Sequence, residues 1–146
     1  MQQDGTHREV SHLQAAECHR LLLALLEDSG VQWESSGEWV RFRFCEDSMV
    51  WELACRCARD EALVYSRYPM RAGDRAAALA ACDEANSALT RGAMFLSGDV
   101  PTFRIRADLQ DAYGARERLA QALEYSAAAI VRYWGKMQSA CRTDSF

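Results

Sequence analysis

Proline and long apolar runs are the two features that this sequence has least of. It holds two prolines and eight glycines in 146 residues, which excludes a collagen-like chain and a proline-rich linker. The longest apolar run near the N-terminus, residues 21–26, is six residues long, whereas a helix needs about 20 to cross a bilayer. We therefore expect neither a membrane-spanning segment nor a membrane partner.

The first nine residues are polar and include acidic side chains, so they lack the apolar core of a secretory signal. We expect a cytoplasmic protein. Seventeen Lys and Arg residues stand against twenty-one Asp and Glu residues, which gives a formal net charge of −4. A general nucleic-acid binder would normally be basic. We therefore expect no nucleic-acid partner, and a local basic patch stays open.

Motifs that carry chemistry are also missing. The chain has no G-x-S-x-G nucleophile motif and neither of the common glycine-rich phosphate loops. All three histidines lie in the N-terminal segment, which disfavours a catalytic triad. Cys55 and Cys57 could share one face of a strand, but no second ligand pair with zinc-site spacing accompanies them. We expect no enzyme activity, no catalytic residue, no cofactor and no metal.

Cysteine is comparatively frequent, and we expect the thiols to be free. The cytosol keeps thiols reduced, and a chain of this length with four tryptophans does not need disulfides to hold a core. A buried cysteine behaves as a small apolar residue, which suits the apolar patterns around several of these positions. The six cysteines are Cys18, Cys45, Cys55, Cys57, Cys82 and Cys141.

The periodicity of apolar residues predicts a single α+β domain over residues 7–138, with flexible termini at 1–6 and 139–146. Apolar residues at helical spacing predict helices over residues 7–29, 75–90 and 112–138. Period-two alternation predicts strands near residues 40–44, 49–57, 63–68, 93–97 and 102–109, while residues 31–37 lead into a bend. The order is α-β-β-β-α-β-β-α. The economical architecture is two layers, in which the first and last helices cover one face of a five-stranded antiparallel sheet.

This order of elements resembles the YbjN family, whose fold is shared with the class I type III secretion chaperones. Three local segments carry the resemblance: CDEANSAL at 82–89, GAMFLSGD at 92–99 and FRIRADL at 103–109. The resemblance covers residues 10–138 by architecture and 79–110 by local pattern. It implies the fold and a place among proposed regulators of bacterial sensory transduction, and it brings no catalytic residue or cofactor. The related secretion chaperones are dimers that hold unfolded stretches of client proteins.

Arginines in the polar phase of the predicted strands are the candidate binding residues. If these strands are neighbours, the helix-free face of the sheet carries a band of guanidinium groups that suits carboxylates or phosphates. Trp39 also lies in the polar phase and is a candidate apolar anchor. The alternative is an ordinary solvated face that Glu52 and Asp108 balance. The five arginines are Arg41, Arg43, Arg56, Arg104 and Arg106.

The helix predicted over residues 75–90 is rich in alanine, which gives it a thin surface. A thin surface permits close packing, either against a sheet edge of the same chain or against a second copy in a homodimer. The candidate dimer-interface residues are Ala78, Leu79, Cys82, Ala85, Asn86 and Leu89.

These features predict a non-enzymatic protein-interaction or regulatory module. We expect a homodimer that binds a protein or peptide partner through the helix-free sheet face. Two alternatives stay open. The first is a dimeric, secretion-chaperone-like holder of a client peptide, which should expose a continuous apolar patch. The second is a small-molecule or anion-binding domain.

Overall fold

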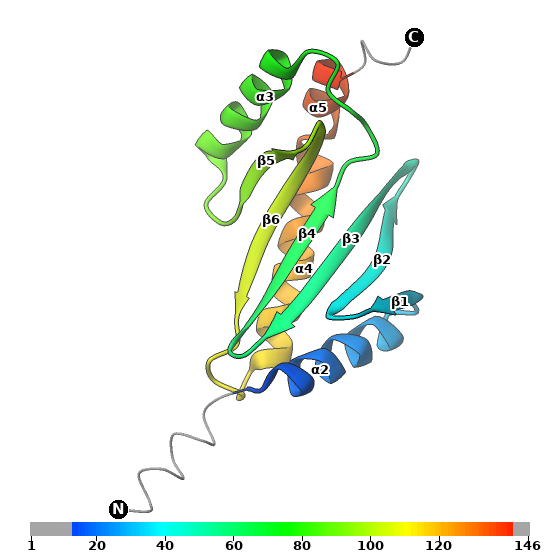
Figure 1. Ribbon diagram of the computed structural model, residues 1–146, viewed down its shortest axis with the longest axis vertical. Helices are drawn as coiled ribbons and strands as arrows, with labels where there is room; N and C mark the ends of the chain where they lie inside the picture. Colours follow the sequence, from blue (N-terminus) through cyan, green and yellow to red (C-terminus); the bar gives the residue numbers. More distant parts are fainter. Residues whose placement is uncertain (1–12, 142–146) are drawn as a thin grey trace, which may run out of the picture.

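A computed structural model describes residues 13–141, and in this part of the chain four helices pack with a six-stranded antiparallel sheet (Figure 1). The helices are α2 (Ala15–Asp28), α3 (Arg75–Ala88), α4 (Ala115–Arg132) and α5 (Trp134–Cys141). The strands are β1 (Trp33–Ser36), β2 (Trp39–Glu46), β3 (Met49–Ala58), β4 (Glu61–Arg67), β5 (Ala93–Ser97) and β6 (Val100–Asp108), in the sheet order β1-β2-β3-β4-β6-β5.

The predictions for the two ends of the chain fall partly outside these residues. The terminus expected to be flexible (1–6), the start of the first expected helix (7–12) and the last residues (142–146) all lie outside the described part. Within it, α5 continues to Cys141, three residues past the expected end of the domain. No helix among residues 13–141 is both long enough and apolar enough to cross a membrane.

The α+β class and the antiparallel sheet are confirmed, but the sheet has six strands rather than five. The extra strand is β1, which pairs with β2 from Trp33 opposite Phe42 to Ser36 opposite Trp39. The predicted bend is thus the turn of a short hairpin, and Gly37 adopts a φ of +62° there. The sequence gives little sign of β1 because three of its four residues are exposed. It therefore lacks the apolar alternation of a half-buried strand.

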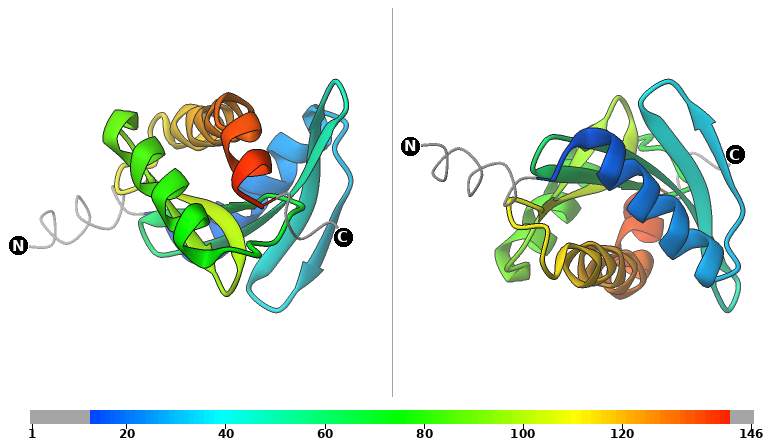
Figure 2. Two further views of the ribbon diagram at one scale, coloured as in Figure 1. Left: turned by 90° about the horizontal axis from the view of Figure 1, so that it is seen from above. Right: turned by 90° about the horizontal axis from the view of Figure 1, so that it is seen from below.

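The sheet buries one face only. Buried side chains alternate with more exposed ones along β2, β3, β4 and β6, as period-two strands require. Helices α2 and α4 pack on the buried face, where α2 contacts β3 and β4 and α4 contacts β4 and β6. Both helices lie on the concave side of the curved sheet (Figure 2). The core side chains of this face include Val40, Phe42, Trp51, Leu53, Val64, Phe103 and Ile105.

The helix predicted over residues 112–138 is broken in two. Tyr133, with φ −102° and ψ 11°, interrupts the helical backbone between α4 and α5. The Tyr68 hydroxyl donates a 2.8 Å hydrogen bond to the carbonyl oxygen of Ile130, one of the carbonyls that the end of α4 leaves free. Burial raises the pKa of the Tyr68 phenol well above its usual value. This bond holds the residue that follows β4 against the C-terminal end of α4.

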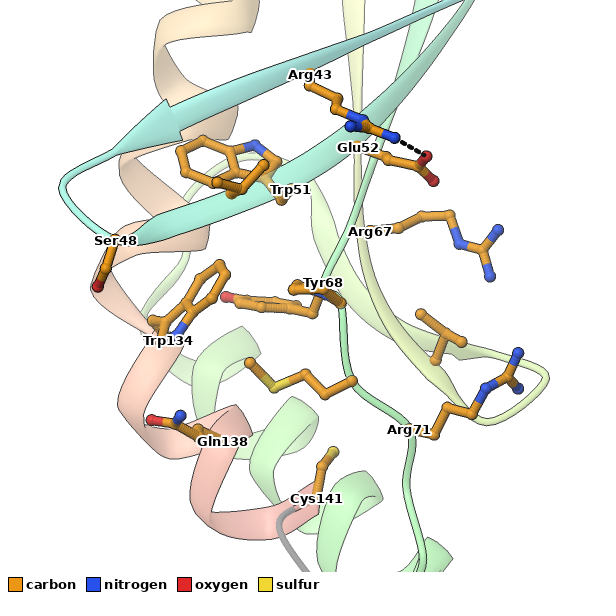
Figure 3. A pocket seen from close by; sticks show the side chains of 14 residues that line it. Arg43, Ser48, Trp51, Glu52, Arg67, Tyr68, Arg71, Trp134, Gln138 and Cys141 are labelled. Atoms are coloured by element: carbon orange, nitrogen blue, oxygen red, sulfur yellow. Dashed lines mark ion pairs between the residues drawn. The ribbon is translucent and has the colours of Figure 1, made fainter. Parts of the chain in front are cut away.

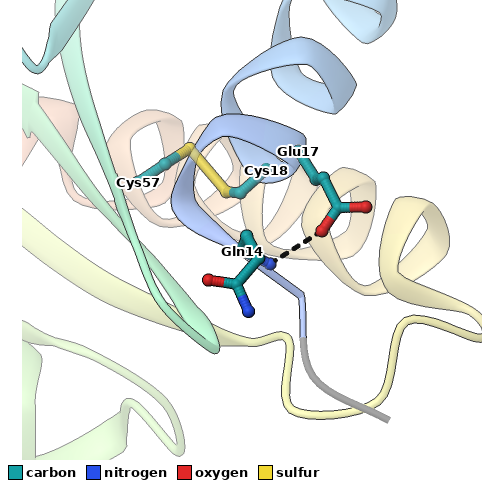
Figure 4. Close-up of a disulfide and its surroundings, with 4 residues drawn as sticks. All are labelled: Gln14, Glu17, Cys18 and Cys57. Carbon is teal, nitrogen blue, oxygen red and sulfur yellow. Dashed lines mark hydrogen bonds between the residues drawn. A yellow bond between two sulfur atoms is a disulfide. The ribbon is translucent and has the colours of Figure 1, made fainter. Parts of the chain in front are cut away.

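A disulfide between Cys18 and Cys57 corrects the expectation of six free thiols (Figure 4). Cys18 lies on the buried side of α2 and Cys57 on the helix-covered face of β3. Their Cα atoms are 5.8 Å apart, within the range that a disulfide spans. The two residues are 39 positions apart in the chain, so only the packing of α2 on β3 shows that they meet. Cys45, Cys55, Cys82 and Cys141 lie outside this disulfide.

Helix α3 covers the outer edge of β5. Asn86 accepts a 2.7 Å hydrogen bond from the Met94 amide through Oδ1, and it donates a 3.0 Å bond to the Met94 carbonyl through Nδ2. The amide side chain therefore pairs with the strand edge as another strand would. Gly92, with φ +72°, makes the turn between the two elements. A Cβ atom there would lie 2.6 Å from the Arg104 carbonyl oxygen.

The disulfide yields a first prediction. Thiol titration of the unfolded, unreduced protein should find four reactive groups rather than six. Cys57→Ser should lower the free energy of unfolding by about 2–4 kcal/mol, because a bond across 39 residues restricts the unfolded chain. Chemical denaturation measures this loss. Cys45→Ser, at an exposed free cysteine, is the control and should be neutral. Six reactive thiols would contradict the bond.

The bonds of Asn86 yield a second prediction. Asn86→Ala should lower the free energy of unfolding by about 1–3 kcal/mol, because it removes both bonds to Met94. It also uncovers an edge strand, so self-association should increase. Denaturant titration and sedimentation velocity measure the two effects. Ser87→Ala, which removes only an exposed bond to the Glu84 carbonyl, is the control. Equal stability of N86A and S87A would contradict this role.

Candidate functional site

The strand register gathers all six predicted binding residues on the sheet face that faces away from α2 and α4. One cross-strand row runs from Trp39 through Arg56 to Arg106. The next row holds Arg41, Tyr65 and Arg104, and the third holds Arg43 and Arg67. Phe95 of β5 lies beside the third row, opposite Thr102. We call this surface the open face and define it by Trp39, Arg41, Arg43, Arg56, Tyr65, Arg67, Phe95, Arg104 and Arg106.

Three aromatic rings form the centre of the open face. The ring centroids of Trp39 and Tyr65 are 5.7 Å apart, and those of Tyr65 and Phe95 are 6.5 Å apart. Two guanidinium groups cover this cluster. Arg56 lies 5.7 Å from the centroid of Trp39, and Arg104 lies 5.9 Å from that of Phe95. A guanidinium stacked on a ring is held in one plane, while its N–H groups still point outward.

Within the described part of the chain, two of the open-face arginines have ion-pair partners. Arg106 hydrogen-bonds to Glu61, and this bond is the main cause that raises the pKa of Arg106. Arg43 and Glu52 approach to 4.0 Å, and both are largely exposed, so this pair contributes little to stability. Among residues 13–141, the structure gives no ion-pair partner to the other four, Arg41, Arg56, Arg67 and Arg104.

The charge of the open side of the sheet opposes that of the whole chain. The strand register places six arginines on this side, together with Glu34, Glu52, Glu61 and Asp108. The side is therefore net positive, although the chain has a formal charge of −4. A positive surface on an acidic protein attracts a negatively charged partner.

Sequence reasoning missed three residues of the open face, namely Tyr65, Arg67 and Phe95. The signal was present, since Leu63, Tyr65 and Arg67 alternate with Ala62, Val64 and Ser66, which are buried. The alternation in this strand is weak because all three outward residues are half-buried. Phe95 lies in a five-residue strand that is too short to assign a face by pattern alone.

Three of the six candidate dimer residues are buried inside the chain. Ala78, Cys82 and Ala85 are buried where α3 packs on β5 and α5. Asn86 bonds to Met94 as described, and Leu89 is half-buried. Burial raises the pKa of the Cys82 thiol. Leu79 is the residue of the six whose apolar side chain is exposed, at 46%. The close packing that the alanines permit is therefore used within the chain, against a sheet edge and α5.

A groove opens beside the open face, at the end of β4 (Figure 3). Strands β3 and β4 are paired only up to Glu52 opposite Arg67. Beyond that point β3 stays paired with β2. The chain after β4 stays with β6, because the Tyr68 amide donates a 3.0 Å hydrogen bond to the Pro101 carbonyl. The separation leaves a groove of about 1140 Å³ that reaches α5. Trp51, Tyr68, Met70, Trp134 and Gln138 line it, together with Arg43, Glu52, Arg67 and Arg71.

The remaining side chains that could react or bind a metal ion are separated from one another. Burial raises the pKa of Cys55 to about 12, so this thiol stays protonated and unreactive at neutral pH. Among residues 13–141, no group of three or more His, Cys, Asp and Glu side chains could hold a metal ion.

Comparison with known proteins gives a structural likeness and no sequence match. No protein-family model matches the chain, and no curated protein matches its sequence. The structure is similar to the crystal structure of YbjN from E. coli, described as a "putative transcription regulator". The TM-score is 0.58 at 14% sequence identity, and the match covers 81% of this chain and 87% of that one. The chain therefore has a YbjN-like α+β fold, as the resemblance of its sequence implied.

Proposed function

We propose that this chain is a non-catalytic regulatory module that binds an acidic segment of a partner protein on its open face. The observation that carries the proposal is the set of arginines that have no ion-pair partner among the described residues and surround an aromatic centre, on a chain that is acidic as a whole. The YbjN-like fold supports a regulatory role by analogy of fold.

The stacked arginines suit carboxylates for a geometric reason. Arg56 and Arg104 are held over Trp39 and Phe95, so less side-chain entropy is lost when they bind. A guanidinium presents parallel N–H groups that match both oxygens of a carboxylate. An acidic side chain can therefore bind to each arginine without displacing it from its ring.

The spacing of the arginines suits an extended segment. Arg41 and Arg43 are two residues apart on β2, and Arg104 and Arg106 are two apart on β6. Side chains two residues apart on a strand point the same way and are about 6.5–7 Å apart. An extended partner with an acid at every second residue has the same spacing. Such a segment would match the arginines of a strand one to one.

The client-holding alternative has less support. A holder of unfolded chains needs a continuous exposed apolar patch. Among the described residues, the exposed large apolar side chains are Val50, Leu79 and Tyr113, which belong to β3, α3 and the segment before α4. The homodimer stays a prediction, and Leu79 is the candidate interface residue that a second copy could contact directly.

Acidic-segment binding can be tested with a fluorescent ten-residue peptide in which Glu and Ser alternate. The double variant Arg41→Gln/Arg104→Gln should weaken binding about tenfold in fluorescence anisotropy, because both residues lie in the central row and have no ion pair to lose. Binding should also weaken as salt is raised from 50 to 300 mM, where screening is stronger.

Two controls separate this effect from general charge and folding. Arg20→Gln changes the same charge at an exposed position of α2, away from the open face, and it should leave the peptide affinity unchanged. A peptide with Gln in place of Glu should not bind. Equal binding by the double variant and the wild-type chain would contradict the proposal, as would an equal loss in R20Q.

A further inference from the structure

We infer that the groove at the end of β4 is a separate binding site for a small aromatic molecule that carries one carboxylate. This site differs from the one proposed for an acidic segment. The groove runs between β3 and the residues after β4 and reaches α5, which is not part of the open face (Figure 3).

The inner wall of the groove is aromatic. Trp134 contacts both Trp51, at 6.2 Å between ring centroids, and Tyr68, at 5.4 Å, with the rings tilted by 58° and 57°. The thioether of Met70 adds a polarisable group to the same lining. Trp51 and Tyr68 are each only 2% exposed, so they hold the ring of Trp134, which is half-buried, in place. The Trp134 ring is therefore the one that a flat ligand can contact, and aromatic pairs gain from such contacts beyond the area buried. The wall therefore favours an aromatic ligand body.

The outer rim of the groove is cationic, and one arginine on it is free to bind. Arg71 is paired with Asp99 at 2.7 Å, and Arg43 lies 4.0 Å from Glu52. Arg67 has no ion-pair partner among residues 13–141. Its Nε atom is buried without a hydrogen-bond partner, a state that costs free energy until an acceptor arrives. Arg67 is therefore the group that would bind the carboxylate.

Two further features limit the ligand to a single negative charge and place that charge at one end of the groove. Glu52 lines the same rim, so a second anionic group would meet like charge there. The opposite end, at Trp134 and Gln138 of α5, carries no charged side chain in the lining. A ligand with its carboxylate at Arg67 and its ring against Trp134 matches both ends.

The direct test is calorimetric titration of the full chain with 2-naphthoate, and with 2-naphthamide as its neutral counterpart of the same shape. We expect naphthoate to bind with one-to-one stoichiometry and at least tenfold more tightly than the amide. Decanoate, which has the carboxylate but no ring, should also bind more weakly. Failure of naphthoate to bind would overturn the inference. Equal binding of the amide would overturn the role of Arg67, and tighter binding of decanoate would overturn the aromatic assignment.

Variants locate the site and separate it from the open face. Arg67→Gln should weaken naphthoate binding about tenfold. Gln138→Trp, at an exposed position of α5, should fill the groove and also weaken it, with no core residue removed. Arg104→Gln, on the open face and outside the groove lining, is the matched control and should bind naphthoate normally. Wild-type affinity in both R67Q and Q138W would overturn the inference.

The acidic peptide distinguishes this inference from the proposed function. Q138W should bind the peptide as the wild-type chain does, because Gln138 lies on α5 and outside the open face. R104Q should weaken peptide binding and keep naphthoate binding. If Q138W loses naphthoate binding and keeps peptide binding, the result supports the groove as a site separate from the open face.

Discussion

The sheet is buried on one side only, and most of the structure depends on this constraint. Along β2, β3, β4 and β6 every second side chain enters the core under α2 and α4. A slip of one residue in any of these strands would place arginines in the core and apolar residues in water. The register that buries Phe42, Leu53 and Ile105 is therefore the same register that aligns the open face.

The sequence was informative where alternation was strong. Along β2, Val40 and Phe42 alternate with Trp39, Arg41 and Arg43, so the face of each side chain could be predicted, and the same holds for the arginines of β6. Contacts between distant segments could not be predicted in this way. The Cys18–Cys57 bond depends on how α2 crosses β3, and the groove depends on where β3 and β4 separate. Neither the disulfide nor the groove produces a periodic pattern of residues in the sequence.

Helix α3 shows how one composition can serve two purposes. Alanine-rich helices approach neighbours closely, and the sequence left open whether that neighbour is the same chain or a second copy. The structure places Ala78, Cys82 and Ala85 against β5 and α5, and Asn86 pairs with the edge of β5. The alanines of α3 show only that a neighbour packs closely on this helix. The bonds of Asn86 identify β5 as one such neighbour.

The strand order has a consequence for how the chain folds. Strands β1 to β4 form one meander and β5 and β6 form one hairpin, so every pairing except β4 with β6 joins strands that are consecutive in the chain (Figure 1). Local pairings form early because little loop entropy is lost. The slow event on the way to the native state should therefore be the meeting of β4 and β6, which must enclose α3 and β5. Since Cys18 and Cys57 both lie on the N-terminal side of this closure, oxidation and reduction should leave its rate nearly unchanged.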